Sequence, residues 1–62
     1  MVVSDIFKVF DSRIVFVIYF KTFFELRLVY EGELQFAPIY TMDYRVLKAR
    51  PTKDGTVILI CE

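Results

Sequence analysis

Seven consecutive apolar residues, from Ile14 to Phe20, constrain the fold of this chain more than any other feature. Most of them are β-branched or aromatic, and these residue types favour strands. An apolar run without alternating polar residues is typical of a strand that is covered on both faces. A second run of this kind, from Val57 to Cys61, lies close to the C-terminus. We therefore expect two buried strands, with residues 14–20 at the centre of a sheet.

The chain has 62 residues, which we expect to form a single small domain over residues 1–62. A domain of this size buries only about 60% of the surface that its unfolded chain exposes. Small domains usually gain stability from disulfides, a metal or oligomerisation. Cys61 is the only cysteine and histidine is absent, so the sequence predicts no intrachain disulfide, no metal site and no cofactor. Oligomerisation, in the form of a homodimer, is then the expected stabilising factor.

The apolar content of the chain also favours self-association. Apolar residues make up 56% of the sequence, compared with about 45–50% in average domains. Large exposed apolar patches usually mark interfaces, although a monomer with an unusually apolar core is the alternative. We expect another molecule to cover the second faces of residues 14–20 and 57–61. The predicted self-association interface consists of Val15, Val17, Tyr19, Phe23, Ile58 and Ile60.

The only good helix candidate is residues 4–11. Ser4 is a suitable N-cap for such a helix. Apolar residues recur at helical spacing, and we expect Phe7 and Phe10 to cover one face of the sheet. A short strand over residues 6–10 is the competing interpretation.

The segment 20–23 decides whether residues 14–30 form one long strand or a hairpin. It contains no Gly, Pro, Asn or Asp, the residues that usually form turns. One strand of such length would be able to pair with a second copy of the chain. Further on, a three-residue hairpin turn is expected over residues 30–32, because it keeps Leu28 opposite Leu34.

One strand and one clear turn are expected in the second half of the chain. Pro38 lacks an amide donor, so the segment around it is an edge strand or bends there. Apolar and polar residues alternate over residues 40–46, which predicts a strand; a short helix capped by Thr41 is the alternative. Asp54 and Gly55 mark a turn before the last strand. The predicted fold is α+β and mostly β: a short N-terminal helix followed by an antiparallel sheet of four or five strands, arranged as a meander of hairpins in a dimer.

The sequence offers little for catalysis. Without histidine, the Ser-His and Cys-His nucleophile pairs are excluded, and no Gly-rich phosphate-binding loop is present. Cys61 lies in an apolar run, as expected for a small buried hydrophobic residue. We therefore expect no catalytic residues and no enzyme activity. The formal net charge of zero also excludes a strongly basic field over the whole molecule.

No targeting segment or membrane span is recognisable. The N-terminus lacks a basic region followed by an apolar run. The longest nearly apolar stretch, residues 14–24, is shorter than the roughly 20 residues that a spanning helix needs. A single cysteine without a signal peptide fits a reducing compartment. The sequence therefore predicts an intracellular, cytoplasmic protein.

One basic stretch follows two tyrosines and is the candidate surface for binding a macromolecule. Proteins that bind single-stranded nucleic acid use basic side chains beside aromatic ones. In a regular strand Arg45 faces away from Lys48 and Arg50, so these residues converge only if the strand twists or bulges near Leu47. The alternative is that the charges protect a sheet edge. The predicted surface comprises Arg45, Lys48, Arg50, Lys53, Tyr40 and Tyr44.

Three segments together resemble the C-terminal sheet of RelE-type toxins, which cleave ribosome-bound mRNA. They are Phe24-Glu25-Leu26-Arg27, Tyr44-Arg45-Val46-Leu47 and Asp54-Gly55-Thr56-Val57-Ile58-Leu59. The resemblance covers residues 24–60 and implies a function related to RNA. The two helices that precede this sheet in the family have no counterpart here, and no catalytic residue is assigned from the resemblance.

Taken together, these patterns favour a small non-enzymatic interaction protein, of inhibitor or adaptor type, that self-associates and binds another macromolecule. A protein partner is favoured over nucleic acid, and no small-molecule cofactor is expected. The alternatives are a nucleic-acid-binding β module that uses residues 45–53 and, more remotely, a RelE-like protein with an RNA-related role.

Overall fold

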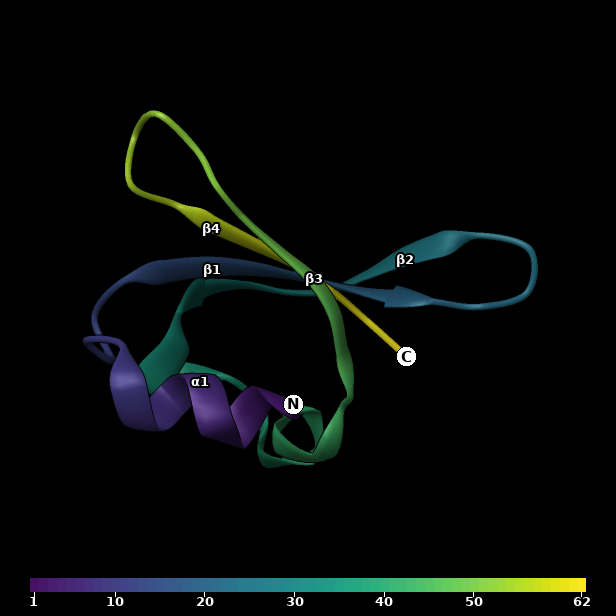
Figure 1. The fold of residues 1–62 in the computed structure, drawn as a ribbon, viewed down its shortest axis with the longest axis horizontal. Coiled ribbons are helices and arrows are strands. Elements are labelled where there is room, and N and C mark those ends of the chain that lie inside the picture. Colours follow the sequence, from purple (N-terminus) through teal and green to yellow (C-terminus); the bar gives the residue numbers. More distant parts are fainter.

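The computed structural model describes every residue from 1 to 62 and contains one α-helix and one sheet (Figure 1). The sheet has four strands, not five, and two 3-10 segments accompany the helix. The predicted α+β class with mostly strands is confirmed. The bounds are Val3–Val9 for α1, Val15–Lys21 for β1, Leu26–Glu33 for β2, Leu34–Phe36 for η1, Ile39–Asp43 for η2, Val46–Pro51 for β3 and Val57–Cys61 for β4.

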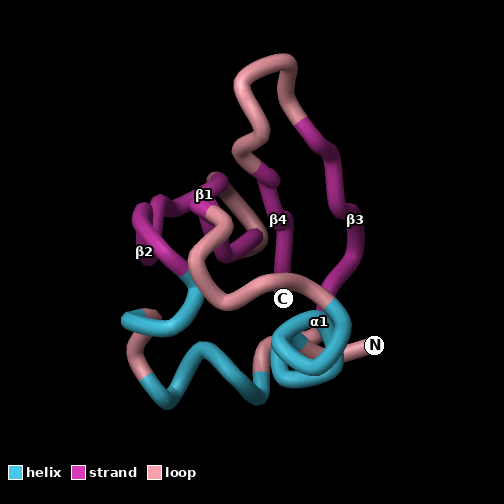
Figure 2. The backbone as a smooth tube through the Cα atoms, turned by 90° about the vertical axis from the view of Figure 1, so that its left-hand side faces the viewer, coloured by secondary structure: helices cyan, strands magenta, loops and turns pink.

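The sheet is mixed, so the predicted antiparallel meander is wrong. The strand order is β2-β1-β4-β3. The pairs β1–β2 and β3–β4 are antiparallel, whereas the central strands β1 and β4 run parallel. This order arises because the chain leaves β2 at one edge, passes η1 and η2 on one side of the sheet, and returns at the opposite edge as β3 (Figures 1 and 2). The two apolar runs thereby become the central strands, whose backbone groups are paired on both sides.

The hairpin between β1 and β2 turns at residues 22–25, where none of the usual turn residues is present. Thr22 supplies the hydrogen bonds that fix this turn. Its amide donates to the carbonyl oxygen of Glu25 at 2.8 Å. Its hydroxyl oxygen accepts from the amides of Phe24 at 3.3 Å and Glu25 at 3.1 Å. Residues 14–30 therefore form a hairpin and not one long strand.

Strand β2 continues through residues 30–32, where the sequence predicts a turn. Gly32 lies inside the strand, opposite Phe16 of β1. The predicted pairing of Leu28 with Leu34 is wrong for the same reason, because Leu34 belongs to η1. The turn was predicted here because glycine is a common turn residue, whereas the hairpin turn of this part of the chain lies at residues 22–25 and depends on the Thr22 hydroxyl.

Residues 34–44 contain no strand, so the strand predicted over residues 40–46 is wrong except for Val46, which begins β3. Thr41 is fully buried, and its amide and hydroxyl both donate to the carbonyl oxygen of Pro38, at 3.0 and 2.6 Å. Local hydrogen bonds of this kind compete with a strand ladder, and η2 forms instead. The alternative of a helix capped by Thr41 is also wrong, because Thr41 lies inside η2.

The core lies between one face of the sheet and the helical segments, which gather on that side (Figures 1 and 2). Helix α1 packs on the sheet mainly through Val3 and Ile6, whereas the predicted Phe7 and Phe10 are 38% and 43% exposed. The helix ends at Val9, and Phe10 just beyond it contacts the core through Phe16 of β1, with the ring centroids 5.8 Å apart in an edge-to-face arrangement. The eight buried hydrophobic residues are Val3, Ile6, Phe16, Ile18, Leu34, Val57, Leu59 and Cys61.

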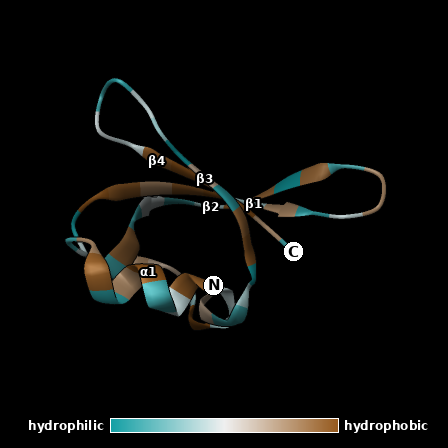
Figure 3. Cartoon of the chain, viewed as in Figure 1, coloured by the Kyte–Doolittle hydropathy of each residue, from teal (hydrophilic) through white to brown (hydrophobic).

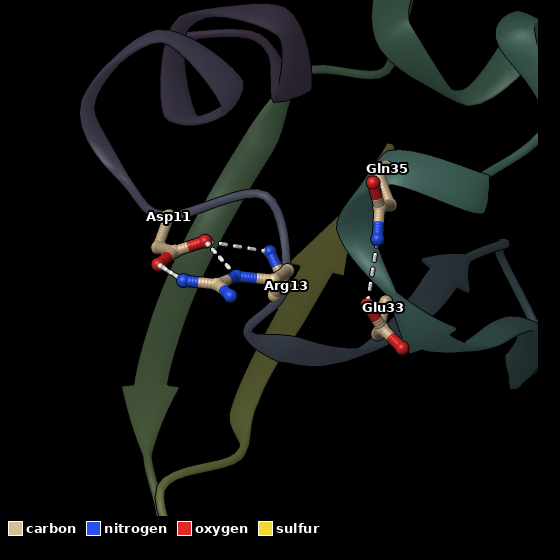
Figure 4. Close-up of polar contacts among 4 residues, drawn as sticks. All are labelled: Asp11, Arg13, Glu33 and Gln35. Carbon is tan, nitrogen blue, oxygen red and sulfur yellow. Dashed lines mark hydrogen bonds and ion pairs between the residues drawn. The ribbon is translucent and has the colours of Figure 1, made fainter.

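The loop before β1 and the end of β2 each contain a set of local polar contacts (Figure 4). Arg13 Nη2 lies 3.3 Å from Asp11 Oδ2, and hydrogen bonds from Arg13 lower the pKa of Asp11. On the neighbouring segment, Gln35 Nε2 donates to Glu33 Oε1 at 2.7 Å. The amide of Gln35 also donates to the carbonyl oxygen of Ser12 at 2.9 Å. The pairing of the two segments thus extends beyond the strand ends.

Candidate interaction surface

No element of the chain covers the side of the sheet opposite the helical segments (Figures 1 and 2). We call this side the open face. Successive residues of a strand point to opposite sides, and residues paired across strands point to the same side. Because Phe16, Ile18 and Leu59 are buried beneath the sheet, their neighbours along β1 and β4 face outward. These outward residues are Val15, Val17, Tyr19, Ile58 and Ile60.

The strand register places five of the six residues of the predicted self-association interface on the open face. The hydropathy view shows hydrophobic residues along much of β1 and β4 (Figure 3). The sixth residue, Phe23, lies at the tip of the β1–β2 hairpin. Phe23 and Phe24 are 94% and 91% exposed, and their ring centroids lie 5.0 Å apart in an edge-to-face arrangement. The hydrogen bonds of Thr22 hold this apolar tip in place.

The edge strands add apolar side chains to the open face that the sequence does not identify. Leu26 and Leu28 of β2 are 52% and 51% exposed, and Leu47 of β3 is 46% exposed. For Leu26 and Leu28, the only sequence signal was the alternation of apolar and polar residues over residues 24–30. The turn predicted over residues 30–32 assigned the apolar residues of this segment to the core. A hollow of about 270 Å³ spans all four strands on this face and is lined by Lys21, Leu26, Leu47, Lys48 and Ile60.

One row of residues across the open face carries opposite charges at its two ends. The register aligns Glu31 of β2, Val17 of β1, Ile58 of β4 and Arg50 of β3. The acid and the base therefore lie at opposite edges of the sheet, with two apolar side chains between them. Neither Glu31 nor Arg50 forms an ion pair within the chain. Both charges are exposed to solvent in the single chain.

A bulge in β3 brings three residues of the predicted basic surface to one side of the strand. The register shifts between Val46 and Lys48, so Leu47 is the extra residue. Leu47 and Lys48 then point to the same face, which reverses the alternation that separates Arg45 from Lys48 in a regular strand. Arg45, Lys48 and Arg50 consequently lie on the open face.

Two of the four predicted basic residues, Arg45 and Lys53, do not provide free cations on the open face. Arg45 Nη2 lies 2.6 Å from Glu62 Oε1, and the backbones of these two residues also exchange hydrogen bonds. Lys53 lies in the exposed turn between β3 and β4. Only Lys48 and Arg50 therefore remain as unpaired cations of this set on the open face.

The two predicted tyrosines do not join the basic residues. Tyr44 packs on Phe20, with ring centroids 4.8 Å apart, and Phe20 shares the covered face with Cys61. Burial raises the pKa of the Tyr44 hydroxyl. Tyr40 lies in η2 beside Tyr44, with ring centroids 6.1 Å apart. The structure thus separates the aromatic and basic parts of the predicted surface.

A second apolar hollow lies on the covered side, between α1 and the segment that contains η2. It measures about 410 Å³ and is open to solvent. Four of its six lining residues are hydrophobic, and its polar members offer no acid–base pair. The lining residues are Ser4, Phe7, Lys8, Ala37, Ile39 and Met42.

Reactive side chains are few, and they are not gathered at either hollow. Cys61 is fully buried, and burial raises the pKa of its thiol to about 11. The thiol is therefore protonated near neutral pH and is a weak nucleophile. No three residues among the Cys, Asp and Glu side chains are grouped closely enough to hold a metal ion. The open face is the main candidate site.

No family model, curated protein or solved structure matches this chain. The resemblance to RelE-type toxins stays a prediction from the sequence. The helical segments are all too short or too polar to form a membrane span.

Proposed function

We propose that this chain is a non-enzymatic interaction protein that self-associates through the open face and binds another macromolecule. The observation that carries the proposal is the apolar outward side of β1 and β4, the two central strands, whose outward side chains are half-buried or exposed and are covered by no element of the chain. In a sheet with one side packed on a core, the other side is usually polar when it faces water. Here the outward positions Val17, Ile58 and Ile60 are all apolar.

Self-association would supply stability that the small core lacks. Only nine of the 62 residues are buried in the single chain. Apolar surface removed from water contributes about 25 cal/mol per Å². A second sheet packed about 10 Å above the open face would remove the outward side chains of β1 and β4 from water. The chain has neither a disulfide nor a metal cluster to provide this stability otherwise.

The β1–β2 hairpin tip provides a separate apolar contact for a further protein partner. The loop between β1 and β2 extends away from the rest of the chain (Figure 1), and its residues Phe23 and Phe24 are almost fully exposed. Aromatic side chains held in a fixed arrangement are effective anchors in protein interfaces. A dimer formed through the open face would leave this tip accessible, as an inhibitor or adaptor requires.

Sedimentation velocity over a range of micromolar concentrations tests the self-association. We expect a concentration-dependent dimer for the natural chain and a monomer for Leu28→Asp, which places a charge on the open face. Ile39→Asp is the matched control, because Ile39 is 86% exposed and lies in η2 on the other side of the sheet. A natural chain that stays monomeric at tens of micromolar would overturn the proposal.

Nucleic-acid binding is the second candidate function, and the bulge at Leu47 favours it. The bulge places Arg45, Lys48 and Arg50 on one side of β3. Phosphate contacts by such residues make binding strongly dependent on salt. Titration of a labelled single-stranded RNA at low salt tests this candidate, with Lys48→Glu as the variant that should weaken binding. Absence of binding at low salt would exclude it, together with the RelE-like alternative.

A further inference from the structure

We infer that two copies pack open face to open face about a two-fold axis parallel to β1 and β4, so that Glu31 of each copy meets Arg50 of the other. This inference rests on the proposed self-association and specifies its geometry. It follows from the row that joins Glu31, Val17, Ile58 and Arg50 across the sheet.

The direction of the axis decides which charges meet. A two-fold axis parallel to the strands reverses the strand order of the second copy, so β2 of one copy lies over β3 of the other. Glu31 then faces Arg50 at both edges, and Val17 faces Ile58 between them. An axis perpendicular to the strands, in the plane between the sheets, would place β2 over β2. That arrangement would bring Glu31 close to Glu31 and Arg50 close to Arg50.

Electrostatics favours the first arrangement over the second. Isologous dimers bury the same patch of both subunits, so a self-complementary patch is required. Like charges placed opposite each other across an interface are strongly unfavourable. Sheets packed face to face keep their strands within about 30° of each other because of their twist. This angle shifts Glu31 of one copy relative to Arg50 of the other, and the long side chain of Arg50 is able to span the shift.

The single chain leaves this acid and this base free to pair between copies. Some charges on or beside this face already have partners within the chain: Arg45 pairs with Glu62, and Glu33 accepts a hydrogen bond from Gln35. Lys21 and Lys48 are also unpaired, but their rows across the sheet end on Leu26 and Leu28 and not on an acid. Glu31 and Arg50 have no such partner. Their positions at the two ends of one row are therefore suited to contacts between copies.

A charge-reversal experiment tests this geometry. Glu31→Arg and Arg50→Glu should each weaken dimerisation by about tenfold or more, because each places like charges opposite each other at both edges. An equimolar mixture of the two variants should form a heterodimer, since the introduced arginine then meets the introduced glutamate, and the two natural residues meet at the other edge. The double variant Glu31→Arg/Arg50→Glu should likewise regain a homodimer.

Matched controls separate this inference from the proposed function. Asp43→Arg and Lys53→Glu make the same charge changes outside the open face and should leave dimerisation unchanged. A dimer that tolerates both single reversals, or a mixture that associates no better than its components, would overturn the inferred axis while leaving self-association intact. A monomeric natural chain would overturn both.

The natural chain provides a further test that does not depend on variants. Added salt screens the exposed Glu31–Arg50 pairs, so the dissociation constant of the dimer should rise as sodium chloride increases. A dissociation constant that stays constant or falls with salt would contradict the inferred contacts, because an interface held only by apolar contacts is not weakened by screening.

Discussion

The ring of Tyr30 lies over Gly32 within the edge strand β2, and its hydroxyl donates to the carbonyl oxygen of Glu33 at 2.6 Å. Gly32 has a φ of +151°, and a Cβ atom added to it would lie 2.8 Å from Tyr30 Oη. Both the backbone conformation and the aromatic side chain therefore require a glycine at this position. The residue that resembles a turn signal in the sequence instead permits a close contact inside a strand.

Gly32→Ala should consequently destabilise the chain by about 1–3 kcal/mol, the usual range for a residue held in a strained backbone conformation. Urea unfolding followed by circular dichroism measures this loss. Gly55→Ala is the control, because Gly55 also has a positive φ, of +88°, but no atom lies near the position of its Cβ. If Gly32→Ala lowers the free energy of unfolding by no more than Gly55→Ala does, the contact with Tyr30 adds nothing to the cost of the substitution.

Leu59→Ala should lower the free energy of unfolding by about 2–5 kcal/mol, as expected for truncation of a fully buried leucine. Leu59 lies in the central strand β4 and has no exposed surface. Ile39→Ala, at a site that is 86% exposed, should cost about 0.5 kcal/mol or less. Equal losses in denaturant unfolding would contradict the burial of Leu59.

Thr22→Val should destabilise the β1–β2 hairpin by about 1 kcal/mol, because it removes a hydroxyl that makes turn hydrogen bonds while keeping the shape of the side chain. The Thr22 hydroxyl also donates to the carbonyl oxygen of Glu25 at 3.2 Å. Amide hydrogen exchange at Phe24 and Glu25 reports the local effect. Thr22→Ser keeps the hydroxyl and should retain most of the protection; equal exchange in both variants would refute this role.

The free energy of unfolding should fall as pH rises from about 9 toward 11. Burial raises the pKa of the Cys61 thiol from 9.0 to about 11. The unfolded chain therefore releases this proton at lower pH than the folded chain, so the contribution is fully present below about pH 9 and is lost as pH rises to about 11. Urea unfolding across this range should show a smaller slope for Cys61→Ala. Identical slopes in the two proteins would show that Cys61 makes no contribution to this pH dependence. We assign the slope that remains in Cys61→Ala to Tyr44, because burial also raises the pKa of its hydroxyl.

Local sequence signals predicted the elements that depend on neighbouring residues. The apolar runs at residues 14–20 and 57–61 became β1 and β4, and the turn at Asp54 and Gly55 lies between β3 and β4. That turn is fixed locally, because the Asp54 carboxylate accepts from the Thr56 amide at 3.1 Å and from the Thr52 hydroxyl. Helix α1 was likewise expected, although its buried residues were not.

Elements that depend on distant contacts were predicted less well. The hairpin turn at Thr22 lacks the usual turn residues, so the sequence left open whether residues 14–30 form a hairpin or one strand. The separate turn predicted over residues 30–32 gave the wrong pairing for β2. Residues 40–46 have strand-like alternation, but most of them lie outside β3 and form local hydrogen bonds such as Thr41 to Pro38. Periodicity does not distinguish these two outcomes, because the ladder that a strand needs comes from another part of the chain.

The sequence by itself determined which residues form the central strands, because a continuous run of β-branched and aromatic residues favours strands inside a sheet, where both edges are paired. It also determined that the chain has more apolar surface than its core holds. Only the tertiary structure decided that β1 and β4 run parallel and that Glu31 and Arg50 share a row. The reason is physical: strand order and register depend on how the chain crosses the sheet, and on bulges at Val29 and Leu47, neither of which is encoded in local periodicity.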